Sequence, residues 1–170
     1  MLKVLIADDE EKICQLIIKL INWEEMGLTV AATASNGLEA LEQAEIYKPE
    51  IVITEIRMPG IDGMELIQKV KEKLPDTEII IISGYRHFEY AQTAIRYGVR
   101  DYLLKPIKKE ELKDTLQRIT EIYKEKNEQL NFEERVRLAL KNDAGKLRTS
   151  FVSRVIYGER ERENVIGLKE

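Results

Sequence analysis

The stretch that decides the fold is Lys3-Val4-Leu5-Ile6-Ala7-Asp8-Asp9, a short apolar run that ends in acids. Two later runs, Ile51 to Thr54 and Glu78 to Ile82, have the same design. Continuous apolar runs of this length are typical of strands that are buried on both faces of a sheet. Leu28 to Ala34 and Tyr102 to Leu104 are weaker versions of the pattern, so the sequence predicts five strands.

Between these runs lie stretches in which hydrophobic residues recur at helical spacing. They cover Ile13 to Leu20, Leu38 to Ala44, Met64 to Val70 and Phe88 to Ile95. Strands that alternate with helices imply a parallel sheet with right-handed crossovers and helices on both faces. For five such units we expect a doubly wound α/β fold, flavodoxin-like, with strand order 2-1-3-4-5.

Functional side chains are expected just after the strands, because doubly wound folds bind ligands beyond the carboxyl ends of their strands. The predicted strand ends carry Asp8, Asp9, Glu55, Ser83 and Lys105. The first and third strands are neighbours in this order, so their acids should lie close together and raise one another's pKa. Mg²⁺ is a natural counterion, because it prefers hard oxygen ligands. A hydroxyl, an ammonium and a metal around one carboxylate suit the stabilisation of a phosphoryl group in transfer.

Composition excludes several classes of function. One Cys and one His in 170 residues leave no disulfide framework and no Cys/His zinc cluster. Residues 1–107 hold 12 Lys and Arg against 18 Asp and Glu, and an acidic body does not attract nucleic acid. The start lacks a signal-peptide pattern, and no stretch approaches the ~18 apolar residues of a membrane span. We therefore expect a cytoplasmic protein without a membrane partner.

Four motifs follow one another at the predicted strand ends and carry a family resemblance. They are Asp8-Asp9, Ile53 to Gly63 (Ile-Thr-Glu-Ile-Arg-Met-Pro-Gly-Ile-Asp-Gly), Ser83-Gly84-Tyr85, and Asp101 to Pro106 (Asp-Tyr-Leu-Leu-Lys-Pro). Together they resemble receiver domains of bacterial two-component response regulators, over about residues 1–125. The sequences from Thr54 to Gly63 and from Ser83 to Ala91 are most similar to those of regulators that carry a C-terminal AraC-type DNA-binding domain.

The resemblance implies a magnesium site. Asp8 and Asp9 match the acidic pair that holds Mg²⁺ in the family, and Glu55 and the Arg57 backbone carbonyl are the further ligands that it implies. It also implies a sensor histidine kinase as partner and a homodimer through the fourth helix, fifth strand and fifth helix.

The resemblance also implies a switch. Ser83 matches the hydroxyl that turns towards the phosphoryl group, and Tyr102 matches the aromatic residue that changes rotamer with it. Lys105 matches the residue that pairs with phosphoryl oxygens, and the peptide bond before Pro106 is expected to be cis. Taken alone, Tyr102 would equally suit packing at the edge of the sheet.

One central position departs from the family. The phosphorylated residue is Asp in receivers, and Glu55 occupies its place. The extra methylene advances the carboxylate by about 1.5 Å, and a misplacement of ~1 Å can cost ~100-fold in rate. We expect little or no phosphorylation. Glu55 either imitates the phosphorylated state, reaching towards Ser83 and Lys105, or pairs with Lys105 in an inactive pocket.

The remaining chain, residues 126–170, is expected to form a helical linker or the start of a middle helical domain. One stripe steps by four and three residues: Leu112, Leu116, Ile119, Tyr123, Lys126 and Leu130. Its first half should pack on the sheet, and its continuation should pair with a second copy or fray. A further amphipathic helix is predicted from Leu147, Phe151, Val152, Val155 and Ile156. No helix-turn-helix pattern follows, so any DNA contact requires an output domain that this sequence lacks.

Two enzyme-like or carrier functions compete with a signalling switch. A phosphatase of this fold would need an Asp-x-Asp nucleophile motif after the first strand, and Asp8-Asp9-Glu10 is not one. An FMN carrier would need a Ser/Thr/Gly phosphate loop where these acids stand, and they would repel the anion. We therefore expect a switch and not an enzyme, with a stand-alone receiver that acts only by protein contacts as the alternative.

Overall fold

The structure is a computed structural model that describes residues 1–142. The chain divides into two units, Met1–Tyr123 and Lys124–Glu170. The first unit holds a five-stranded parallel sheet in the order β2-β1-β3-β4-β5. Its strands are β1 (Leu2–Ala7), β2 (Leu28–Ala34), β3 (Ile51–Thr54), β4 (Glu78–Ser83) and β5 (Asp101–Leu104). The predicted doubly wound order is confirmed.

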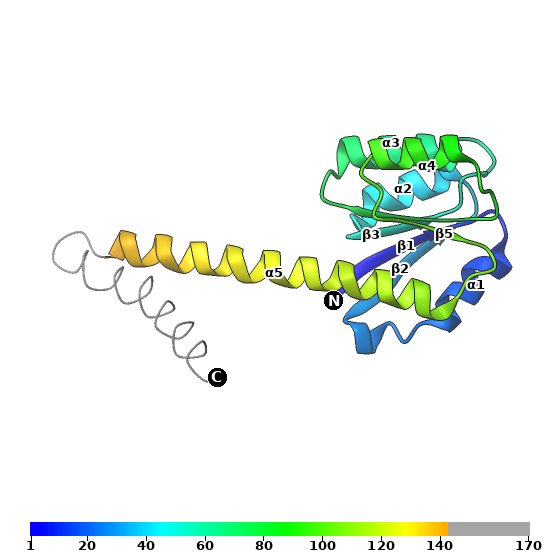
Figure 1. Ribbon diagram of the computed structural model, residues 1–170. Helices are drawn as coiled ribbons and strands as arrows, with labels where there is room; N and C mark the ends of the chain where they lie inside the picture. Colours follow the sequence, from blue (N-terminus) through cyan, green and yellow to red (C-terminus); the bar gives the residue numbers. More distant parts are fainter. Residues whose placement is uncertain (143–170) are drawn as a thin grey trace, which may run out of the picture. The chain divides into compact units, whose positions relative to one another are not determined.

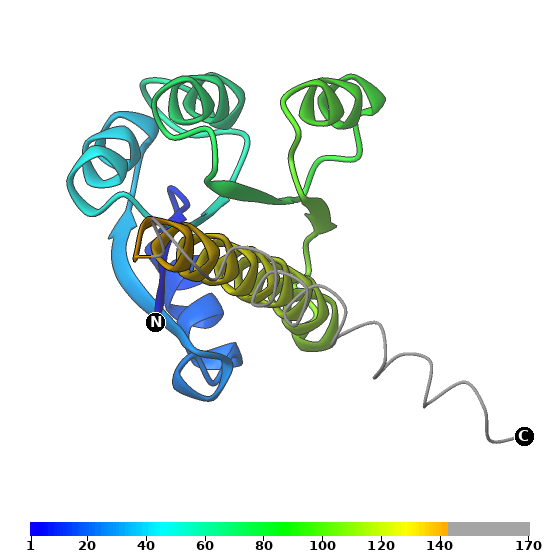
Figure 2. The ribbon, with the colours of Figure 1, turned by 90° about the vertical axis from the view of Figure 1, so that its left-hand side faces the viewer.

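Helices cover both faces of this sheet. They are α1 (Glu11–Leu20), α2 (Gly37–Tyr47), α3 (Gly63–Lys73), α4 (Phe88–Arg96) and α5 (Lys109–Asn142), and a short 3₁₀ helix, η1, spans Glu24–Met26. In Figures 1 and 2, α2, α3 and α4 lie on one face of the sheet, while α1 lies on the other. The connections between parallel strands therefore pass over both faces, as in doubly wound folds generally.

The core consists of two hydrophobic clusters, one on each face. Along β1, Val4 and Ile6 belong to the cluster under α1 and α5, whereas Leu5 and Ala7 belong to the cluster under α2, α3 and α4. Both sets are buried because β1 lies inside the sheet, between β2 and β3. The continuous apolar runs of the sequence thus correspond to strands with two buried faces.

Helix α5 begins on the sheet. Leu112, Leu116 and Ile119 are fully buried in the first cluster, which confirms the predicted packing for the first half of the stripe. One turn further on, the Tyr123 hydroxyl donates to the Asp76 carbonyl at 2.6 Å, and the Glu50 carbonyl lies 3.2 Å from the same oxygen. Tyr123 therefore ties the helix to the start of β4.

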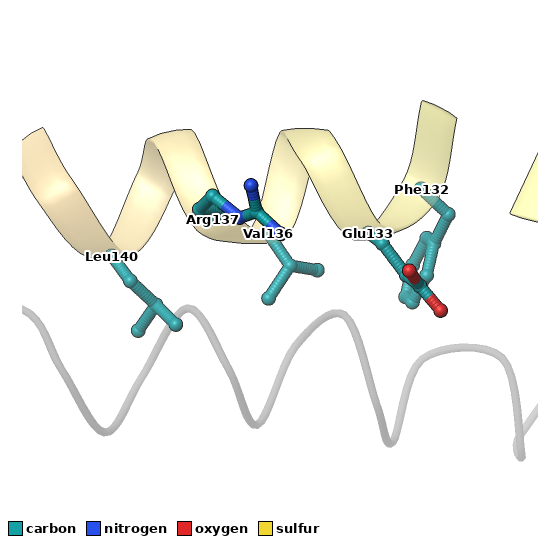
Figure 3. A pocket seen from close by; sticks show the side chains of 5 residues that line it. All are labelled: Phe132, Glu133, Val136, Arg137 and Leu140. Carbon is teal, nitrogen blue, oxygen red and sulfur yellow. The ribbon is translucent and has the colours of Figure 1, made fainter. Parts of the chain in front are cut away.

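The second unit is described up to residue 142. Lys126 and Leu130, which continue the stripe, are exposed, and pairing through them with a second copy stays a prediction. Another side of the helix carries Phe132, Val136 and Leu140, spaced by four residues, which line a pocket together with Glu133 and Arg137 (Figure 3).

The amphipathic helix predicted from Leu147 to Ile156 lies outside the described residues. Within residues 1–142, no helix combines the length and the apolar character that a bilayer crossing requires.

Candidate functional site

The side chain of Lys105, directly after β5, lies between two buried acids. Its Nζ is 2.9 Å from Asp8 Oδ2 and 2.9 Å from Glu55 Oε2. Asp8 and Glu55 are only 2% and 5% exposed. They meet because β1 and β3 are neighbours and each acid follows directly on its strand. The structure therefore brings together three of the predicted site residues, from positions 97 residues apart at the extremes.

The Glu55 carboxylate uses both of its oxygens. Oε2 takes the Lys105 ion pair, and Oε1 accepts the backbone N–H of Ile56 at 2.6 Å. The Glu55 N–H donates to the Ala7 carbonyl at 2.9 Å, which continues the ladder to β1. The long side chain thus folds back over its own backbone while it holds the ammonium.

Two glycines hold the loop after β3 tightly. A β-carbon built on Gly63 would lie 2.1 Å from the Glu55 carbonyl oxygen, and one built on Gly37 would lie 2.1 Å from the Ile61 carbonyl oxygen. The Gly63 N–H also donates to the Ile56 carbonyl at 2.6 Å. Only glycine permits this approach of α2 and α3 to the loop.

The pKa values of Asp8 and Lys105 reflect burial and the ion pairs between them and Glu55. Burial raises the pKa of Asp8, although the Glu10 N–H and Lys105 oppose the shift through hydrogen bonds. Burial alone would lower the pKa of Lys105, but its hydrogen bonds to Glu55 and Asp8 outweigh this, and the pKa is raised. Two buried carboxylates therefore share one ammonium.

Ser83 and Tyr102 lie at the ends of the neighbouring strands β4 and β5. Ser83 is fully buried, and its hydroxyl accepts the backbone N–H of Tyr85 at 3.3 Å. The Tyr102 hydroxyl donates to the Tyr85 carbonyl. Burial raises the pKa of Tyr102. Ser83 and Tyr102 are thus both hydrogen-bonded to the same residue, Tyr85.

The sequence reasoning missed the side chain of Arg57 and the aromatic residues of the loop between β4 and α4. The Arg57 guanidinium carbon stands 4.1 Å from the centre of the Tyr85 ring. Tyr85 stacks on His87, and His87 meets Tyr90 edge-on. The sequence signal that could have revealed this cluster is the close spacing of three rings, at positions 85, 87 and 90. His87 itself is exposed at the start of α4.

The magnesium ligands implied by the sequence are partly assembled. Asp9 is exposed beside buried Asp8. Within residues 1–142, no set of three His, Cys, Asp or Glu side chains is arranged to hold a metal ion. The donor chemistry nevertheless fits a hard cation, because Asp8, Asp9 and Glu55 offer carboxylate oxygens and Lys105 pairs with two of them, Asp8 and Glu55. Lys105-Pro106 is a cis peptide, as expected.

Comparison with known proteins identifies the arrangement. Residues 4–117 match the family described as the response regulator receiver domain. The chain belongs to this family. The predicted receiver domain is thereby confirmed, and its site has the strand-end layout described above.

Curated relatives are longer than this receiver. It is 44% identical over 119 residues to the uncharacterized transcriptional regulatory protein YesN of Bacillus subtilis (strain 168), which covers 70% of this chain and 32% of YesN. It is 38% identical over 129 residues to the transcriptional regulatory protein HptR of Staphylococcus aureus (strain N315), which covers 76% of this chain and 50% of HptR. The chain thus spans from 32% to 50% of the length of these relatives.

Solved structures agree with the fold. The REC domain of AraT, a response regulator from Geobacillus stearothermophilus, is 40% identical, has a TM-score of 0.71, and the match covers 74% of this chain and 98% of that one. A two-component transcriptional regulator AraC from Clostridium phytofermentans ISDg is 33% identical, with a TM-score of 0.66, and the match covers 71% of this chain and 94% of that one.

Proposed function

We propose that this chain is the receiver switch of a two-component transcriptional regulator whose AraC-type DNA-binding domain lies outside the sequence. YesN and HptR carry the names of transcriptional regulatory proteins, and one similar structure is titled a two-component transcriptional regulator AraC. The chain signals through protein contacts in the cytoplasm and turns over no free substrate. Its output domain contacts DNA, and no membrane partner is involved.

The observation that carries the proposal is the Lys105 ammonium shared by Asp8 and Glu55. In the family resemblance, Lys105 pairs with the oxygens of a phosphoryl group on the acceptor. Here Glu55 stands at the acceptor position, and its own Oε2 occupies Lys105 at 2.9 Å. We infer that Glu55 prevents phosphorylation and imitates its electrostatic result, with the Tyr102 hydroxyl already bonded to the Tyr85 carbonyl.

Magnesium is part of this proposal because the site offers carboxylate oxygens. Asp8, Asp9 and Glu55 would hold the ion through their carboxylates, and Arg57 through its backbone carbonyl. The bound ion supplies positive charge against oxygens that gather at the acceptor. Lys105 holds the carboxylates of Asp8 and Glu55 without the ion, so the chain itself keeps these two acids together.

The proposed protein partners are a sensor histidine kinase and a second copy of this chain. The second copy would bind through α4, β5, α5 and the C-terminal helix. Phe88 and Ile95 support this choice, because they leave 79% and 78% of their surface exposed on α4. Large apolar side chains exposed together favour association. Residues 126–170 are proposed as the helical linker towards the output domain.

The test compares the chain with Glu55→Asp, each incubated with acetyl phosphate and Mg²⁺. We expect only Glu55→Asp to gain the mass of one phosphoryl group and to dimerise in response, measured by intact mass and light scattering. The parent chain should dimerise unaided. Glu10→Asp, the same substitution at an exposed neighbour of the site, is the matched control. A phosphoryl group found on Glu55 would refute the proposal.

A second candidate is a phosphorylation-independent receiver that acts only by protein contacts. The contacts of Glu55 favour it, because each of its carboxylate oxygens already has a partner within the protein. In that case, parent and Glu55→Asp chains would show the same association, with and without the phosphodonor.

A further inference from the structure

Tyr85 connects three parts of the receiver through three different groups. Its backbone N–H donates to the Ser83 hydroxyl at 3.3 Å, and its carbonyl accepts the Tyr102 hydroxyl. Its ring lies under Arg57, 4.1 Å from the guanidinium carbon. Whatever fixes the ring of Tyr85 therefore also fixes the carbonyl to which Tyr102 is bonded.

Arg57 is the residue that fixes this ring. It lies in the loop after β3, two positions beyond Glu55, whereas Tyr85 lies in the loop after β4. One side chain thus joins the acceptor loop to the loop after β4.

The neighbouring rings limit how Tyr85 can move. Its other ring contact is the stack with His87, which in turn meets Tyr90 edge-on. Tyr90 and Tyr102 both pack against the same hydrophobic cluster beneath α4. Release of the Tyr85 ring would therefore free the loop whose carbonyl now accepts the Tyr102 hydroxyl.

We propose that Arg57 is a positioning residue for the switch, which holds the Tyr85 ring so that the Tyr85 carbonyl keeps its hydrogen bond from the Tyr102 hydroxyl. The cation is essential to this role, because the face of an aromatic ring attracts positive charge. An exposed contact of this kind favours the bound arrangement by about two- to fivefold. The inference rests on the receiver assignment and is independent of the proposed mimicry by Glu55.

The test measures the χ1 populations of Tyr102 in the full chain, from three-bond couplings in isotope-labelled protein. Arg57→Ala keeps the backbone carbonyl and removes the cation, and it should lower the ratio of the Tyr102 rotamer bonded to the Tyr85 carbonyl over the other rotamers by about two- to fivefold. Arg57→Lys keeps a cation and should recover part of that loss. Arg86→Ala, which removes an exposed cation from the same loop as Tyr85, should leave the populations unchanged. Thermal unfolding checks that every variant is folded.

Each result is decisive. Unchanged Tyr102 populations in Arg57→Ala overturn the inference, and so does an equal loss in Arg86→Ala, which would indicate a general effect of loop charge. Repeating the pair in the Glu55→Asp background separates this inference from the proposed function. If mimicry is wrong, Glu55→Asp alone leaves Tyr102 unchanged, while Arg57→Ala still lowers the ratio in both backgrounds.

Discussion

At the scale of single residues, the site depends on the direction of the Glu55 carboxylate. The sequence located Glu55 and Lys105, because each follows a run of apolar strand residues. It could not predict that one Glu55 oxygen accepts the Ile56 N–H while the other takes Lys105. Which donors the Glu55 oxygens accept depends on local competition among nearby N–H groups. The pattern of hydrophobic residues carries no information about that competition.

Removal of the ammonium should destabilise the receiver strongly. Lys105→Ala leaves the carboxylates of Asp8 and Glu55 buried without their shared partner, and breaking such a pair costs about 3 kcal/mol or more. Urea unfolding at neutral pH measures the loss. Combining Lys105→Ala with Glu55→Gln should recover part of it, since one buried charge is then removed. Stability equal to that of the parent would contradict the ion-pair arrangement.

Asp9 allows a test of the magnesium ligands that leaves the core untouched. Asp9 is exposed, so Asp9→Asn should preserve stability while it weakens Mg²⁺ binding by about tenfold or more. Isothermal titration with Mg²⁺ measures the change. Glu24→Gln, at an exposed acid of η1, should bind as the parent does. Equal affinity of the Asp9→Asn and parent proteins would remove Asp9 from the ligand set.

At the scale of elements, α5 shows what a periodic pattern does and does not predict. The spacing of Leu112, Leu116 and Ile119 predicted the buried face of the helix. It gave no sign that Tyr123 would meet the carbonyls of Asp76 and Glu50. A stripe reports which side chains are apolar, whereas this contact depends on which backbone carbonyls remain available at the start of a strand.

The Tyr123 contact should make stability depend on alkaline pH. Burial, and then the charges of Glu78, Glu50 and Asp76, raise the pKa of Tyr123 from 10.0 to about 12. The folded state therefore binds this proton more tightly than the unfolded state. The resulting stability is complete below pH 10 and is lost as the pH rises towards 12.

Tyr123→Phe lacks this proton and gives the measurement. The parent should be more stable near neutral pH, and the difference in unfolding free energy should shrink as the pH rises from about 10 to about 12. Tyr47→Phe, which removes a hydroxyl from an exposed tyrosine on α2, is the matched control. A difference that stays constant over this range would contradict the assigned role of the hydroxyl.

At the scale of the whole molecule, the strand order followed from the alternation of strands and helices. The order in turn placed Asp8, Glu55 and Lys105 at one edge of the sheet, which is why sequence reasoning could find them. The contact of Arg57 with Tyr85 joins two loops, and loop conformation is not specified by the periodicity that reveals strands and helices. The sequence therefore does not predict the contact between Arg57 and Tyr85.

The proposed dimer gives a prediction at the same scale. Replacing Phe88 and Ile95 together by Ser should change stability by no more than about 0.5 kcal/mol, because both side chains are already exposed. The same double variant should weaken self-association in light scattering. Leu38→Ser, an exposed apolar residue on α2, should leave association unchanged. If the double variant associates as the parent does, the surface on α4 is not the dimer interface.

The close approach of Gly63 to the Glu55 carbonyl has a consequence for any exchange at the acceptor position. The backbone at Glu55 packs against α3 on one side and is hydrogen-bonded to β1 on the other, so it cannot shift to accommodate a different side chain. A longer or shorter acidic side chain at position 55 therefore changes the position of its carboxylate by the full difference in length. For this reason, exchange of Glu for Asp at position 55 changes the reach of the carboxylate while the backbone stays in place. The comparison therefore tests how far into the site an acid can extend.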